Sequence, residues 1–175
     1  AFRILFNIRF YYPVFMVMFL KYGITLEQFG LLNAVWAVVI VLLEVPSGAL
    51  ADILGRKALL VAAAIMMTVE MLLLAVVPIG SSWVFPALLL NRILSGAAEA
   101  FASGADEALA FDSLKAVGKD GDWPRVLERL MQVGGLATIV AMVTGSLVYS
   151  PDLIQAASDW AGYKTLITLD DTFRL

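Results

Sequence analysis

The sequence contains neither cysteine nor histidine. The chain can therefore form no disulfide and no thiolate metal site, and it lacks the commonest metal ligand and the commonest general base. Charge is also scarce, because Asp, Glu, Lys and Arg make up 15% of the 175 residues and leave a net charge of −3. So small an acidic excess argues against a nucleic-acid partner. We expect no enzymatic activity, no cofactor and no bound metal.

Apolar residues, by contrast, make up 61% of the chain. Soluble domains carry about 45–50% apolar and about 25% charged residues, so this composition cannot cover a water-facing surface. A membrane-crossing helix needs about 20 mostly apolar residues. Five such runs cover residues 2–22, 29–51, 58–77, 84–105 and 124–148. We predict an all-α membrane protein whose transmembrane bundle occupies residues 1–149.

Residues 150–175 differ from these runs, because they are polar and contain too few apolar residues to cross a bilayer. We read them as an external segment and expect a sixth helix to begin after Leu175. Because the chain starts at Ala1, we also expect residues upstream. On this interpretation the bundle is an incomplete six-helix half.

Lysine and arginine are distributed unevenly around the five runs. One side collects Arg3, Arg56, Lys57, Lys115, Lys119, Arg125 and Arg129, and the other Lys21, Lys164 and Arg174. Because basic residues concentrate on the cytoplasmic side, the N-terminus is expected in the cytoplasm and the protein in the plasma (inner) membrane.

The loop between the second and third runs carries the most informative motif, Gly48-Ala-Leu-Ala-Asp52-Ile-Leu-Gly55-Arg56-Lys57. A glycine at a helix end allows close helix approach, and Gly55 suits a tight turn. Asp52 can meet a helix N-terminal dipole or a nearby arginine. Arg56 and Lys57 hold the loop on the cytoplasmic side. An ordinary basic hairpin loop is the alternative interpretation.

This Gly-x-x-x-Asp-x-x-Gly-Arg-Lys spacing resembles the signature loop of the major facilitator superfamily. In the fourth run, Leu88-x-x-x-Arg92-x-x-Ser95-Gly96 is similar to the family's arginine motif, although Ala98 replaces a second glycine. The fifth run lacks the Gly-Pro pair of the family's antiporters, which weakens a drug-antiporter reading. The resemblance implies the N-terminal half of such a transporter, with the first and fourth helices lining a cavity and a C-terminal half missing.

Ionisable residues inside apolar runs are functional candidates because each costs several kcal/mol to insert. The fourth run carries one polar stripe, since positions 92, 96, 99 and 103 share a helical face. We assign to the transport cavity and its proton coupling Arg9, Glu44, Arg92, Gly96, Glu99 and Ser103, with Glu99 as the proton-exchanging acid. Arg9 could instead snorkel to the headgroups. Glu70 and Arg92 match in depth by the helical rise, which predicts a structural ion pair.

These features together predict a secondary active transporter that moves a small solute by alternating access, coupled to protons. The alternative is a non-transporting membrane fragment, or an assembly partner of a second half. The resemblance does not choose among drug, sugar, amino-acid and peptide cargo, because fold does not fix substrate. Beyond the fourth run, Asp106, Glu107 and Asp112 could pair with Arg56 and Lys57 or remain a solvated loop.

Overall fold

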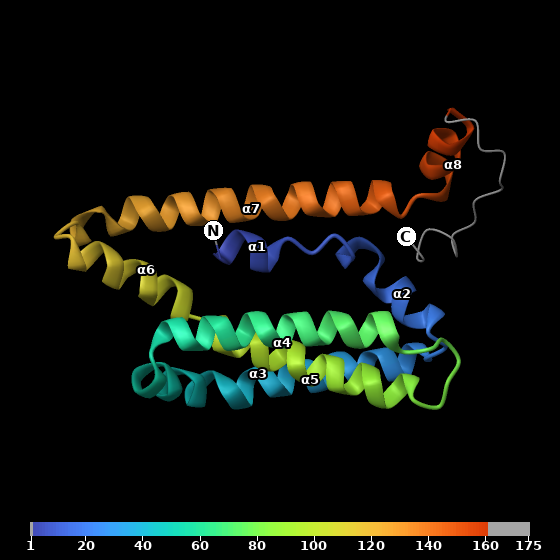
Figure 1. Ribbon diagram of the computed structural model, residues 1–175, viewed down its shortest axis with the longest axis horizontal. Coiled ribbons are helices and arrows are strands. Elements are labelled where there is room, and N and C mark those ends of the chain that lie inside the picture. Colours follow the sequence, from blue (N-terminus) through green and yellow to red (C-terminus); the bar gives the residue numbers. More distant parts are fainter. Residues whose placement is uncertain (1, 161–175) are drawn as a thin grey trace. The chain divides into compact units, whose positions relative to one another are not determined.

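The computed structural model describes residues 2–160, which form helices joined by short connections (Figure 1). The α-helices are α1 (Phe2–Asn7), α2 (Phe15–Lys21), α3 (Leu26–Leu54), α4 (Arg56–Val76), α5 (Val84–Ala102), α6 (Ala105–Ala116), α7 (Trp123–Val148) and α8 (Pro151–Trp160). Two 3-10 turns, η1 (Tyr12–Val14) and η2 (Asp120–Asp122), precede α2 and α7.

Within residues 2–160, five segments are long and apolar enough to cross a membrane. They are Phe2–Lys21, Leu26–Leu54, Arg56–Val76, Val84–Ala116 and Asp120–Val148. The sequence-based prediction of an all-α, multi-pass membrane protein is thereby confirmed. The predicted sixth helix, and the external segment from residue 161 on, lie outside the described residues.

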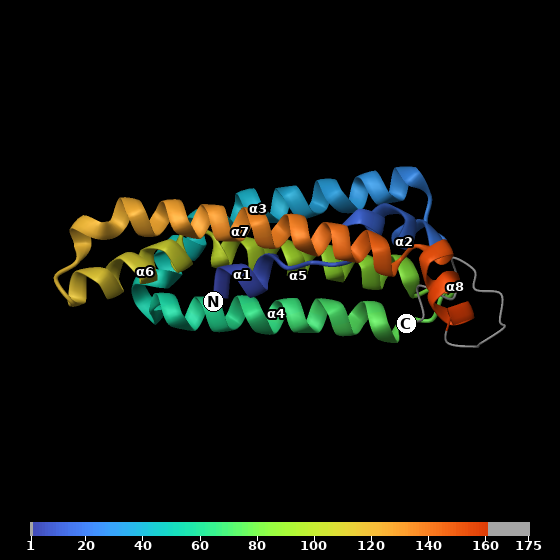
Figure 2. The same ribbon diagram turned by 90° about the horizontal axis from the view of Figure 1, so that it is seen from above.

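The chain divides into two compact units, one of residues 19–129 and one that joins the residues up to Met18 with those from Leu130 on. In the first unit, α3, α4 and α5 run side by side, and α5 lies between the other two (Figures 1 and 2). Its position explains why α5 buries most of its residues, whereas α3 exposes a long row of apolar side chains.

Local sequence signals set the ends of α3. At its start, the Thr25 hydroxyl accepts from the Gln28 backbone N–H at 3.2 Å, and the Gln28 side chain accepts from the Thr25 N–H at 2.9 Å, which is a capping box. At its end, Gly55 has a φ of 88°, a conformation that favours glycine, and α4 begins at the next residue. The predicted boundaries of 29 and 51 were therefore each three residues short.

Tyr22 fastens the α2–α3 connection to α4. Its hydroxyl donates to the backbone carbonyl of Leu74 at 2.5 Å. Burial raises the pKa of Tyr22 above its usual 10.0, because the phenolate form would lose its hydration. The hydroxyl therefore stays protonated and keeps donating throughout the physiological pH range.

The first apolar run is not one continuous helix, which differs from the prediction of a single span over residues 2–22. Helix α1 ends at Asn7, and regular helix resumes only at Phe15. Pro13 explains the break, because it has no N–H to donate to the Arg9 carbonyl and its ring would collide with that group. The Arg9 carbonyl instead accepts from Tyr12 N–H at 3.3 Å.

The fourth apolar run is also divided, at Ser103 and Gly104. Gly104 has a φ of 71°, which lets the chain turn before α6 begins at Ala105. Because α6 carries Asp106, Glu107 and Lys115 among its residues, it is far more polar than α5. The run predicted to end near residue 105 therefore ends at Ala102, and the acidic segment beyond it is helical.

Candidate functional site: a polar cluster among membrane helices

Helix α5 combines small residues with two adjacent strongly polar ones. Pro86 lies in its first turn, where a backbone N–H has no intrahelical partner to lose. Its last two turns are built almost wholly from small residues, which let neighbouring helices approach closely. The buried members of that stretch are Ser95, Gly96, Ala97, Ala98, Ala100 and Ala102. Asn91 and Arg92, one turn earlier, are also buried.

Asn91 joins Arg92 to the neighbouring helix α4. Its side-chain oxygen accepts from Nε and Nη2 of Arg92, at 3.0 and 2.7 Å. Its side-chain nitrogen donates to the backbone carbonyl of Glu70 at 2.9 Å. Glu70 and Arg92 are 0% and 5% exposed, so both charged residues lie inside the protein at the same level of the α4–α5 pair. The ion pair between their side chains stays a prediction.

An aromatic residue completes the surroundings of Arg92. The guanidinium carbon lies 5.2 Å from the centre of the Phe19 ring, within the range of a cation–π interaction. Phe19 is itself fully buried and packs edge-to-face on Phe29. An amide oxygen and an aromatic ring face thus contact a cation inside a membrane helix. Such a cluster can hold a charge, or exchange one, away from bulk water.

Close contact between α5 and α3 depends on Gly96. A side-chain carbon at this position would lie 2.8 Å from the backbone oxygen of Trp36 and 3.0 Å from Val39 Cβ, too near for either. The same region holds two buried polar atoms, Trp36 Nε1 and Ser95 Oγ, that make no hydrogen bond within the described part of the chain. Unsatisfied buried polar atoms are rare and characteristic of functional or hydrated positions.

The remaining predicted cavity residues of this unit lie outside the Asn91 cluster. Glu99 is half-buried on α5, Ser103 is exposed directly after α5 ends, and Glu44 is exposed on α3. The carbonyl of Glu44 accepts from the hydroxyl of Ser47, which is buried in the turn that contains Pro46. Their assignment to one cavity stays a prediction.

In the segment from Gly48 to Lys57, Arg56 contacts helix α6. Its guanidinium forms an ion pair with Asp112 of α6 and donates to the Ala108 carbonyl at 2.7 Å. Of the two interpretations of the acidic segment, the structure therefore supports pairing for Asp112. The side chains of Asp52 and Lys57 are exposed and make no hydrogen bond or ion pair with the described residues. Gly48 is exposed within α3, with open space beside it.

Arg9 belongs to the second unit and sits in the break between α1 and η1. Its guanidinium lies 5.4 Å from the Phe6 ring centre and 5.2 Å from that of Tyr12, and it donates to the Tyr12 hydroxyl. It is 6% exposed. These aromatic contacts come from residues three positions before and after it, so Arg9 is held by its own segment.

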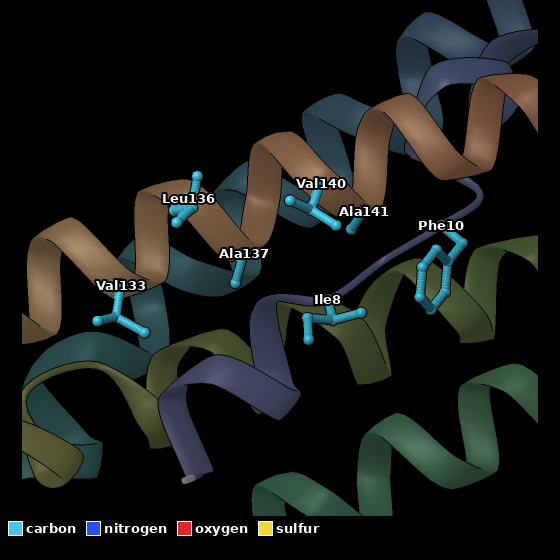
Figure 3. Close-up of a pocket in the computed structure, with 7 residues that line it drawn as sticks. All are labelled: Ile8, Phe10, Val133, Leu136, Ala137, Val140 and Ala141. Carbon is cyan, nitrogen blue, oxygen red and sulfur yellow. The ribbon is translucent and has the colours of Figure 1, made fainter.

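A cavity of about 260 Å³ lies beside this break, between the segment Ile8–Phe10 and helix α7 (Figure 3). Its lining is wholly apolar and consists of Ile8, Phe10, Val133, Leu136, Ala137, Val140 and Ala141. Solute sites need a few convergent polar groups to orient the ligand, and this cavity offers none. One turn beyond it, Gly145 allows the unwound backbone onto α7, since a Cβ there would lie 1.9 Å from the Phe10 oxygen.

Asn91 and Phe19 were not predicted as partners of Arg92. The predicted site residues in the apolar runs were mainly ionisable, although the amide beside Arg92 is also visible in the sequence. Phe19 carries no such signal, because phenylalanine is common in membrane helices. No protein family model matches the chain, and neither a curated protein nor a solved structure matches it.

Proposed function

We propose that the chain is part of a secondary active transporter of the major facilitator type, which moves a small solute by alternating access and couples it to protons. One observation carries the proposal, the buried Arg92 held by Asn91 beside Glu70. An arginine at the centre of a membrane helix costs about 3 kcal/mol to insert, so its presence in α5 favours a function. The motif from Gly48 to Lys57 supports the same family.

Glu99 is the proposed proton-exchanging residue. It is half-buried on α5 and lies two turns beyond Arg92, on the face that Gly96 shares. A half-buried acid can reach both a cavity and water, which a proton site requires as the protein alternates between states. Arg9 and Glu44 complete the proposed layer of charges, with the N-terminus in the cytoplasm and the protein in the plasma membrane.

The signature loop has a separate proposed role in the equilibrium between open and closed states. Arg56 ties the start of α4 to α6, while Asp52 remains exposed and available to another part of the full transporter. In the full-length protein, Asp52→Asn is expected to slow transport and to leave expression largely intact. Unchanged turnover with altered substrate affinity would count against this role.

Open space beside Gly48, Gly134 and Gly135 supports a second candidate function, an assembly partner for a second half. Small residues on membrane helices allow another helix to approach closely. Residues 1–175 alone are then expected not to transport. Accumulation of any solute against its gradient by vesicles that contain only this chain would contradict that expectation.

Proton flux driven by a solute tests the proposed function. The full-length protein is reconstituted in vesicles loaded with a pH-sensitive dye, and sugars, amino acids, peptides and organic cations are added in turn. At least one class should drive proton entry, and Glu99→Gln should abolish it while Asp106→Asn, a matched change on α6, should not. Folded protein that responds to no class would refute the transporter, and coupling that survives Glu99→Gln would refute the proton site.

A further inference from the structure

Helix α8 separates polar from apolar residues more sharply than the long helices α3, α4, α5 and α7 of the described residues. Pro151 occupies its first position and Asp152 its first turn, both favourable at a helix start. Gln155 donates to Asp159 at 2.8 Å, one turn along the polar face. Leu153 and Trp160, seven positions apart, share another face, and they are 48% and 92% exposed.

The position of α8 relates it to the membrane boundary. Helix α7 belongs to the fifth candidate span and ends at Val148, and two residues separate it from α8. A linker of two residues reaches at most about 10 Å, so α8 starts where the chain leaves the bilayer. The axis of α8 turns across that of α7 in both views (Figures 1 and 2). A helix that turns across a membrane-crossing helix runs along the membrane surface.

The length of α8 excludes a crossing by this helix. Ten residues span about 15 Å, half of the roughly 30 Å hydrocarbon core. A tryptophan beside the end of a span is typical of the interfacial belt, where an indole sits among the headgroups. An exposed leucine and tryptophan on one face, next to a membrane boundary, therefore match the pattern of a helix that lies in the interface.

We propose that α8 is an interfacial anchor that lies flat in the membrane surface at the end of the fifth span. Leu153 and Trp160 enter the boundary between headgroups and acyl chains, roughly 5–10 Å deep, and Asp152, Gln155 and Asp159 face water. Its partner is a zwitterionic phospholipid surface, because α8 carries two acids and no base, and anionic lipids would repel it. This inference does not depend on the proposed transport function.

Spin labels on the full chain test this anchor, since the sequence has no cysteine to give background. Single cysteines replace Asp152, Leu153, Gln155 or Trp160, and the labelled proteins are placed in phosphatidylcholine vesicles. Labels at 153 and 160 should collide often with oxygen and rarely with a water-soluble nickel complex, and labels at 152 and 155 should do the reverse. Four water-exposed labels, four labels at the bilayer centre, or four labels shielded from both reagents would each overturn the proposal.

Two further variants separate the apolar face from general effects of charge. With the label at 160, Leu153→Asp should move it toward water, whereas Gln155→Asp adds the same charge on the polar face and should leave its depth unchanged. Equal shifts would contradict an anchor that depends on Leu153. Adding about one third phosphatidylglycerol should make the label at 160 shallower, and a deeper label would contradict the preference for zwitterionic lipid.

Discussion

Helices α5 and α7 both belong to candidate spans, yet they treat their polar side chains differently. In α7, hydroxyls bond within the helix, as Thr138 donates to the Gly134 carbonyl at 3.0 Å and Thr144 to that of Val140 at 2.6 Å. In α5, Asn91 reaches across to α4. The first pattern satisfies a polar group within its own helix, and the second requires a neighbouring helix.

The hydrogen bonds of α5 and α7 indicate where a membrane helix can carry a charged side chain. A hydroxyl can be satisfied by the carbonyl one turn earlier, as those of Thr138 and Thr144 are in α7. Arginine cannot be satisfied that way, because its guanidinium has five donors. Arg92 is tolerated because its guanidinium donates to Asn91 and lies near the Phe19 ring. Asn91 can accept these bonds in a fixed position because it also donates to the Glu70 carbonyl of α4.

The largest expected effect comes from removing the link between α5 and α4. Asn91→Leu keeps the size of the side chain but removes the acceptor of two charged N–H groups and the donor to the Glu70 carbonyl. We expect a loss of about 3 kcal/mol, as for bonds to buried charged groups. Unfolding in detergent micelles titrated with dodecyl sulfate measures it. Thr138→Val is the matched change on α7 and should cost less than about 0.5 kcal/mol; equal losses would erase the distinction.

The second effect concerns close packing. Gly96→Ala places a carbon against the Trp36 carbonyl and should cost about 2 kcal/mol, because α3 and α5 must separate. Gly135→Ala on α7 meets open space and should be neutral, or stabilise by about 0.5 kcal/mol through helix propensity. The same unfolding titration measures both. A destabilising Gly135→Ala with a harmless Gly96→Ala would contradict the close packing at position 96 and the open space at position 135.

The smallest effect lies at the polar end of the bundle, where water weakens ion pairs. The side chains of Arg56 and Asp112 are 31% and 52% exposed, so we expect a coupling of about 0.5 kcal/mol in a double-mutant cycle of Arg56→Gln and Asp112→Asn. It should fade in 1 M salt, where charges are screened within about 3 Å. The cycle of Lys57→Gln with Asp112→Asn should show no coupling, and an equal value there would disprove a specific pair.

The sequence predicts the membrane fold well, because apolar runs of about 20 residues are a direct consequence of bilayer thickness. It misses the break before Pro13, although proline is a strong signal, because the composition of residues 2–22 remains apolar across the break. The capping box at Thr25 and Gln28 was also readable and would have moved the start of α3. Helix breaks and helix caps, which the average composition of a run does not reveal, can thus be predicted from individual residues.

The candidate site is less predictable, because its partners are distant in the sequence. The pairing of Arg56 with Asp112, rather than with Asp106 or Glu107, depends on the turn at Gly104 and on the rotation of α6. The role of Asn91 depends on which face of α5 meets α4. Helical periodicity gives the members of a face but not the helix it faces, so Arg92 was found from the sequence and its amide partner was not.

Labelling of single positions from either side of the membrane tests most directly whether α4 and its neighbours cross it. Single cysteines replace Lys57, Ser81 or Lys119 in a chain with no native cysteine, and sealed vesicles are treated with an impermeant maleimide. Positions 57 and 119 should react on one face, and position 81, beyond the other end of α4, on the opposite face. Labelling of positions 57 and 81 from the same face would contradict a membrane-crossing α4.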